Sequence, residues 1–230
     1  CIMINSPNNP TGSVMSKKDL EGVSRLALEN DLRVVSDEVY EKLIYSGEKH
    51  VSIASLDGMS ERTITVNSFS KTYAMTGWRV GYCVADEATV SKMVKFQMFL
   101  AACPVSFEQY AIARALDDPR SAAAVERMRR EYQDRRDYIF GRLKVMPGIE
   151  VAKPQGAFYI FPRIGGNDVA FSERLLSKAK VVVVPGSSFG THGEGHIRLC
   201  YATSMGSIEK AMDRLEGFMA TGATRKAVRR

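Results

Sequence analysis

Lys71 is the residue with the clearest capacity for covalent chemistry. It follows a β-rich run and has two hydroxyl side chains beside it, Ser68 and Ser70. A lysine amine whose pKa is lowered can attack an aldehyde and form a Schiff base. Arg79 stands eight residues further on, and with Ser68 it could hold a phosphate through charge-assisted hydrogen bonds. Taken alone, Lys71 would more simply be a surface lysine.

Two further polar segments follow strand-like runs. Residues 5–12 read NSPNNPTG, which by itself is typical of a plain turn. Residues 36–40 read SDEVY, where Asp37 could cap the next helix or hold a cationic nitrogen. Tyr40 would then be a nearby hydroxyl donor. Neither segment is decisive alone.

The order of these segments resembles that of fold-type I pyridoxal-phosphate aminotransferases. N-P-T-G is followed by D-x-x-Y, then by S-x-S-K, and then by R-x-G eight residues after the lysine. The similarity is greatest to the class I subgroup that includes aspartate and aromatic aminotransferases. The second half of the chain agrees with it at residues 154–159 (PQGAFY), 185–190 (PGSSFG) and 197–202 (IRLCYA). The resemblance covers the chain except for its basic tail.

The resemblance implies a role for each matching residue. Lys71 would bind the aldehyde of pyridoxal 5'-phosphate and later move the proton between the substrate Cα and the cofactor. Asp37 would pair with the ring nitrogen and keep it protonated, so that the ring serves as an electron sink. Tyr40 and Asn9 would hydrogen-bond the phenolic oxygen of the cofactor.

The remaining matches concern anionic groups. Ser68 and Arg79 would hold the cofactor phosphate, with Ser70 a weaker candidate. Arg198 would clamp the substrate α-carboxylate with its planar fork, next to Asn9. The resemblance also implies a homodimer with active sites at the subunit interface.

The implied reaction is transfer of an amino group between an amino acid and a 2-oxo acid in a ping-pong cycle. Aspartate, an aromatic amino acid and alanine all remain open as the donor. Two other activities share Lys71, Asp37 and Arg198, namely a C–S lyase and a cyclopropane-forming synthase. A ligand-sensing domain of a transcription regulator is a further alternative.

Three other motifs are present but incomplete. Residues 68–71 satisfy the S-x-x-K pattern of serine β-lactamases, but S-D-N and K-T-G are missing. Residues 186–190 satisfy G-x-S-x-G, but the glycine-rich segment that follows cannot form the helix of a nucleophile elbow. His192 and His196 are four apart without a helix to align them, so we expect no metal site.

Strands alternate with helices in the first half of the chain, which predicts a parallel α/β sheet with its ligand at the carboxyl ends of the strands. The predicted strands are 2–5, 32–36, 63–66 and 80–84. A helix is predicted over 20–28, after a Ser16 cap with Asp19 three residues further on. Residues 88–143 are almost entirely helical, with breaks at Pro104 and Pro119. Beyond residue 148 we predict strands over 157–161, 181–184 and 197–202 and helices over 171–179 and 207–219.

We therefore predict three regions of an α/β fold of the fold-type I class. Residues 1–119 form part of the cofactor-binding large domain with a mainly parallel sheet. Residues 120–143 form a linking helix, and residues 144–230 form a small α+β domain with a basic tail. Because the chain opens inside a strand, we expect it to be a fragment, which by itself would be inactive.

Composition narrows the class of protein and its location. The 230 residues are 45% hydrophobic and 25% charged, as in an ordinary globular protein. No apolar run approaches the roughly 20 residues that cross a bilayer. The four cysteines form no C-x-x-C pair, which favours reduced thiols and a cytoplasmic location. The net charge of +6 has no accompanying aromatic-basic pattern, so we expect neither a nucleic-acid nor a membrane partner.

Overall fold

The computed structural model describes residues 1–45, 47 and 49–221, and these divide into two compact units. Unit 1 contains residues 1–8 and 13–129, and unit 2 contains residues 9–12 and the chain from residue 130 onward. The basic tail at 225–230 lies outside the described residues. Within the described part of the chain, no helix is both long enough and apolar enough to span a membrane.

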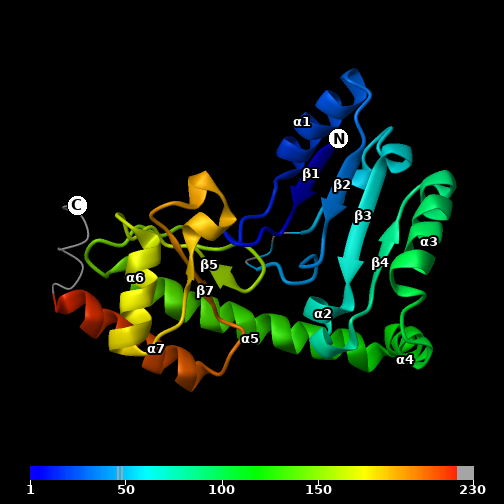
Figure 1. Cartoon of the computed structure of the whole chain (residues 1–230). Helices are drawn as coiled ribbons and strands as arrows, with labels where there is room; N and C mark the ends of the chain where they lie inside the picture. Colours follow the sequence, from blue (N-terminus) through cyan, green and yellow to red (C-terminus); the bar gives the residue numbers. More distant parts are fainter. Residues whose placement is uncertain (46, 48, 222–230) are drawn as a thin grey trace. The chain divides into compact units, whose positions relative to one another are not determined.

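Unit 1 is built on a four-stranded sheet with the strand order β1-β2-β3-β4 (Figure 1). The strands are β1 (Ile2–Asn5), β2 (Val34–Asp37), β3 (Thr63–Ser68) and β4 (Gly81–Val84). The first three are parallel, so the predicted mainly parallel sheet is confirmed. β4 runs antiparallel to β3, because residues 69–80 hold only short turns of helix that do not return the chain to the start of β3.

Helix α1 (Lys17–Glu29) covers this sheet and begins at the predicted cap. The Ser16 side chain accepts from the amide of Asp19, and the Asp19 carboxylate accepts from the amide of Ser16. This reciprocal pair satisfies two amides at the helix start. The apolar face of α1 packs into a core with β2 and the turns that follow it, formed by Leu20, Ala27, Val34, Ile53 and Met59.

The helical region predicted over 88–143 is confirmed, with both proline breaks. It consists of α3 (Glu87–Ala101), α4 (Ser106–Asp117) and α5 (Pro119–Lys144). Proline suits the first position of a helix because the amide there has no partner within the helix. The division between the two units falls inside α5, after Arg129. Shorter helical turns are η1 (Ile53–Ser55), η2 (Ser60–Arg62), α2 (Phe69–Thr72) and η3 (Thr76–Trp78).

Unit 2 contains a small antiparallel sheet with the strand order β5-β7-β6. Its strands are β5 (Tyr159–Ile160), β6 (Val184–Pro185) and β7 (Ile197–Cys200). Its further helices are α6 (Asp168–Arg174), a π-helical turn (Leu175–Ala179), η5 (Gly186–Phe189), η6 (Thr191–Gly193) and α7 (Met205–Ala220).

The strand predicted over 181–184 is wrong except at its last residue. Four successive valines favour a strand by propensity, but only Val184 has a partner in β7. Val182 is instead 77% exposed. The helix predicted over 171–179 starts earlier, because Asn167 caps it through the amide of Ala170, and it ends in the π-helical turn.

Candidate active site

The carboxyl ends of the three parallel strands meet at one edge of the unit 1 sheet. β1 ends at Asn5, β2 at Asp37 and β3 at Ser68. Asn5 lies in register with Asp37, and its side chain donates to the Asp37 carbonyl over 3.2 Å. The amide of Ser6 donates to the same carbonyl over 3.1 Å. The polar segment after β1 is therefore tied to the end of β2.

Lys71 lies at the same edge, in the short helix α2 that begins immediately after β3. The hydroxyl of Ser68 caps this helix by accepting from the amide of Ser70 over 3.1 Å. Ser70 is buried and Lys71 is half-buried. Since β2 and β3 are neighbours, Asp37 and Lys71 come from adjacent strand ends.

Arg79 lies two residues before β4, and the first residue of β4, Gly81, is in register with Ser68 at this edge. Its neighbour Val80 accepts at its carbonyl from the Ser68 hydroxyl and from the Phe69 amide, each over 3.3 Å. Arg79 itself is exposed and has a φ of 54°, in the left-handed region that residues other than glycine rarely adopt. Its guanidinium donates to the carbonyl of Thr76 over 3.0 Å. Backbone strain of this kind is characteristic of binding sites.

The electrostatics of Asp37 fit a cationic partner. Burial raises the pKa of its carboxyl group, and the nearby charge of Glu38 adds to this rise, although the amide of Val39 donates to the carboxylate over 3.3 Å. A carboxylate in this environment is stabilised by a positive charge. A protonated ring nitrogen would supply that charge. Tyr40, only 3% exposed, lies in the turn directly after β2.

Arg198 projects from β7 in unit 2 and is held on three sides. Its Nη1 donates to the side-chain oxygen of Asn9 over 2.8 Å. Its guanidinium carbon lies 4.5 Å from the ring centre of Tyr159 and 5.0 Å from that of Phe189. The Nε of Arg198 is buried and has no hydrogen-bond partner among the described residues. A fixed guanidinium with an unused donor is suited to binding a carboxylate.

The segment that carries Asn9 is fixed by Gly12. The Gly12 carbonyl accepts from the amides of Gln155 and Gly156, each over 2.8 Å. Gly12 has a φ of +69°, and a Cβ there would come within 2.6 Å of the Pro154 Cβ. Only glycine fits this position, so the N-P-T-G segment packs directly against the P-Q-G segment.

The eight predicted site residues thus fall into two sets. Unit 1 holds those assigned to the cofactor, which are Asp37, Tyr40, Ser68, Ser70, Lys71 and Arg79. Unit 2 holds Asn9 and Arg198. Tyr159 and Phe189 were not predicted as site residues. They lie in segments that carry the family resemblance, but only the folded chain shows that they pack on Arg198.

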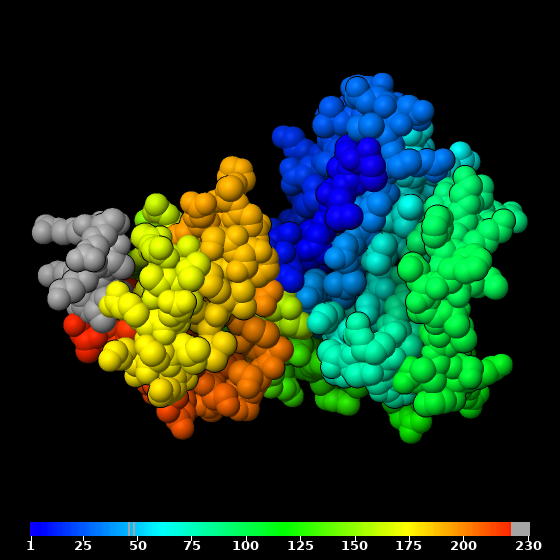
Figure 2. Space-filling model, viewed as in Figure 1, coloured from blue at the N-terminus to red at the C-terminus, as the bar shows by residue number. Residues whose placement is uncertain are grey.

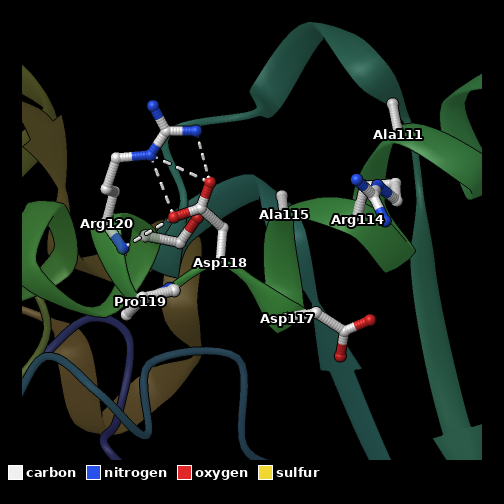
Figure 3. A pocket seen from close by; sticks show the side chains of 8 residues that line it. Ala111, Arg114, Ala115, Asp117, Asp118, Pro119 and Arg120 are labelled. Atoms are coloured by element: carbon white, nitrogen blue, oxygen red, sulfur yellow. Dashed lines mark hydrogen bonds and ion pairs between the residues drawn. The ribbon is translucent and has the colours of Figure 1, made fainter.

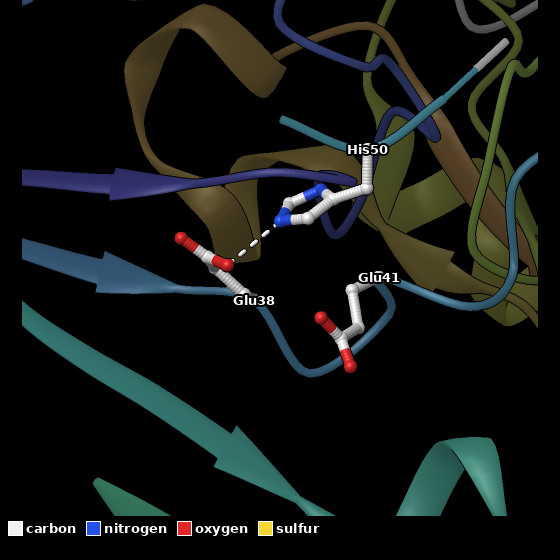
Figure 4. Close-up of side chains that lie close together, drawn as sticks. All are labelled: Glu38, Glu41 and His50. Atoms are coloured by element: carbon white, nitrogen blue, oxygen red, sulfur yellow. Dashed lines mark hydrogen bonds and ion pairs between the residues drawn. The ribbon is translucent and has the colours of Figure 1, made fainter. Parts of the chain in front are cut away.

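Two other features are separate from these sets. A cavity of about 620 Å³ lies where α4 meets α5, and Asp118 and Arg120 form an ion pair at its rim (Figure 3). None of its lining residues is a predicted site residue. Glu38, Glu41 and His50 form a cluster whose oxygen and nitrogen atoms lie within 4.8 Å of one another (Figure 4).

Comparison with known proteins agrees with this geometry. The sequence is 59% identical over 218 residues to aromatic-amino-acid aminotransferase 2 of Thermococcus litoralis, covering 94% of this chain and 56% of that protein. It is 60% identical to an aspartate aminotransferase of Pyrococcus abyssi, with the same two coverages. The chain therefore spans little more than half the length of these relatives.

Solved structures give the same result. A crystal structure of an aromatic aminotransferase from Pyrococcus horikoshii superposes with a TM-score of 0.94 at 55% identity, over 97% of this chain and 60% of that one. This similarity confirms the predicted fold-type I architecture. Residues 1–215 match the aminotransferase class I and II family, whose enzymes depend on pyridoxal phosphate. The chain belongs to the class I and II aminotransferase family.

Proposed function

We propose that the full-length protein is a pyridoxal-phosphate-dependent aminotransferase that moves an amino group between an amino acid and a 2-oxo acid in a ping-pong cycle. The observation that carries this proposal is the meeting of Asp37, Ser68, Lys71 and Arg79 at the carboxyl edge of the parallel strands. The activities named for the relatives from Thermococcus and Pyrococcus support it.

When bound, the cofactor supplies an electron sink for the charge that develops at the substrate Cα. Asp37 would accept a hydrogen bond from the ring nitrogen and stabilise its proton. By the family resemblance, Tyr40 and Asn9 would each hydrogen-bond the phenolic oxygen. The Nζ of Lys71 would hold the cofactor aldehyde and would move the proton at the substrate Cα as a general base.

The anionic groups are held by separate residues. Ser68 and Arg79 would bind the phosphate, with Ser70 a weaker candidate. Arg198 binds the substrate α-carboxylate, supported by Asn9. The stacked Tyr159 and Phe189 keep the guanidinium plane in one orientation.

We further propose that the donor is an aromatic amino acid or aspartate, after the names of the relatives. Residues 1–119 would belong to the large domain, 120–143 to a linking helix and 144–230 to the small domain. The functional assembly would be a cytoplasmic homodimer. All four cysteines are free, which supports a reducing compartment.

The test uses the full-length protein incubated with pyridoxal phosphate. We expect a visible absorption band that borohydride reduction locks onto Lys71, together with transamination of aromatic, aspartate or alanine donors with a 2-oxo acid. Lys71→Ala should fold normally and lose both signals. Peptide mapping that places the adduct on another lysine would contradict the proposal. Repeated turnover of one amino acid without a 2-oxo acid, beyond the one equivalent of product per site that a ping-pong transaminase forms, would indicate a lyase instead.

A further inference from the structure

Glu38 is a buried carboxylate that the proposed chemistry does not use. Its side chain is 3% exposed, and three side chains donate to it. Its Oε1 accepts from the hydroxyls of Ser36 over 2.8 Å and Ser52 over 2.7 Å. Its Oε2 lies 2.7 Å from the Nε2 of His50 (Figure 4). We call Glu38, Ser36, His50 and Ser52 the Glu38 clamp.

The carboxylate of the Glu38 clamp is ionised. Burial raises the pKa of Glu38, but the hydrogen bonds from His50, Ser52 and Ser36 outweigh burial, so the pKa lies below its ordinary value. An ionised carboxylate only accepts hydrogen bonds, so His50 donates from Nε2. Its Nδ1 is buried and has no partner among the described residues. Among the described residues, the His50 side chain therefore makes one hydrogen bond, the one to Glu38.

In the sequence, Glu38 lies between Asp37 and Tyr40, the two residues that we propose contact the cofactor ring. The amide of Glu38 donates to the carbonyl of Val66 over 2.9 Å and so continues the pairing of β2 with β3. Successive residues of a strand point to opposite faces, so Ser36 and Glu38 share one face and Asp37 points to the other. Tyr40 follows Glu38 by two residues, inside the turn that the Glu38 carbonyl closes by accepting from the amide of Glu41 over 2.9 Å.

The Glu38 clamp also closes the segment that contains Tyr40. Glu38 joins the end of β2 to His50 and Ser52, which lie twelve and fourteen residues later in the chain. Fixing both ends of a segment reduces the number of conformations it can adopt. The turn with Tyr40 is thus anchored on both sides by one buried side chain.

A metal ion is the competing explanation for this cluster. Glu38, Glu41 and His50 offer ligand atoms at compatible separations. However, both oxygens of Glu38 already accept hydrogen bonds, and Nε2 of His50 is used in one of them. A metal would have to displace these bonds, so the hydrogen-bonded arrangement explains the cluster better.

We propose that Glu38, acting through Ser36, His50 and Ser52, is a positioning residue that holds Asp37 and Tyr40 against the cofactor ring. This inference rests on the proposed function. Glu38 does not touch the cofactor itself, because it lies on the opposite face from Asp37. Without Glu38, the side chains of Asp37 and Tyr40 would be free to move relative to the cofactor ring. A displacement of about 1 Å can reduce a rate by about 10²-fold.

The test compares three variants of the full-length protein, Glu38→Ala, Glu38→Gln and the control Leu20→Ala. Leu20 is a core residue of α1, so its truncation destabilises the fold without removing a hydrogen bond of the Glu38 clamp. The readouts are the melting temperature of the apoprotein, the affinity for pyridoxal phosphate, and the pH midpoint of the visible band of the bound cofactor.

Glu38→Ala should weaken cofactor affinity by about tenfold or more, as loss of supporting contacts around a bound group does. It should also raise the pH midpoint of the band by about one unit, because the Tyr40 hydroxyl no longer stabilises the ionised form. Glu38→Gln should keep the cofactor affinity and the pH midpoint of the band close to those of the wild type. Its oxygen still accepts from the two serines, and its amide can donate to His50 after the proton moves to Nδ1. Leu20→Ala should lower only the melting temperature.

Three other outcomes would each contradict a different part of the proposal. If Glu38→Ala changes only the melting temperature, as Leu20→Ala does, the positioning role is wrong and the proposed function stands. If the wild-type protein shows no visible band, the proposed function itself fails. If Zn²⁺ stabilises the wild type but not His50→Gln, the cluster is a metal site and the inference is overturned.

Discussion

At the scale of single residues, the ionised Asp37 carboxylate would stabilise a bound cation but lowers the stability of the protein without one. Burial raises the pKa of its carboxyl group above the ordinary value. A raised pKa in the folded state means that the fold binds the proton more tightly than the unfolded chain does. Ionisation at neutral pH therefore lowers stability. The lost stability returns as the pH falls through the raised pKa of the folded state, and the return is complete below the unfolded pKa of about 3.9.

Asp37→Asn should therefore raise the stability of the apoprotein at pH 7 while weakening cofactor binding and abolishing most activity. The gain in stability should shrink as the pH approaches 4. Urea unfolding of apoprotein at pH 7, 5 and 4 measures it, with the exposed Asp117→Asn as the control that should show no such trend. A loss of apoprotein stability at pH 7 would show that the Asp37 carboxylate has a stabilising partner in the fold.

The proposed role of Arg198 leads to a second prediction at this scale, which concerns substrate binding. Arg198→Lys keeps the positive charge but loses the planar fork and the stacking between Tyr159 and Phe189. We expect KM for the amino acid to rise by about 10 to 100-fold, as the loss of a charged hydrogen bond of 1.5–3 kcal/mol implies, with the cofactor band unchanged. Arg163→Lys, at an exposed ion pair with Glu150, should leave KM unaltered. An equal change in both variants would contradict the role of Arg198.

At the scale of elements, the sequence predicted those whose signals are local. The Ser16 cap, the two proline breaks and the alternation of strands and helices all depend on neighbouring residues. The features that were not predicted correctly depend on residues far apart in the sequence. The valines at 181–184 have strand propensity, but β7 pairs only with the last of them. The Glu38 clamp was not predicted for the same reason. Its donors His50 and Ser52 lie twelve and fourteen residues from Glu38, and no rule of sequence spacing predicts such contacts.

Gly12 gives the prediction at this scale, because it joins two loops that the sequence shows only as separate motifs. Gly12→Ala should destabilise the protein, since its φ of +69° is unfavourable for alanine and the new Cβ would meet Pro154. Gly22→Ala is the matched control on α1, with no atom within 4 Å of its Cβ. It should instead stabilise the protein by up to about 1 kcal/mol. Chemical denaturation of the two variants measures the contrast, and equal effects would contradict the packing of the two loops.

At the scale of the whole molecule, α3 and α4 carry many exposed apolar side chains. Both helices are drawn in green in Figures 1 and 2. No residue of α3 is buried. Phe99 is 92% exposed and Leu100 is 81% exposed. Six further large apolar side chains on the two helices are also exposed, namely Val94, Phe96, Met98, Phe107, Tyr110 and Leu116. Monomeric proteins rarely leave contiguous apolar surface of this kind in water.

The last prediction concerns the 230-residue chain by itself. We expect it to self-associate through α3 and α4 and to transaminate at a small fraction of the rate of the full-length protein, since it spans little more than half the length of its relatives. Light scattering and an assay with added pyridoxal phosphate measure the two properties. Phe99→Lys should reduce association without lowering the melting temperature, because Phe99 has little packing to lose. Comparable turnover by the chain and the full-length protein would show that these residues are sufficient for catalysis.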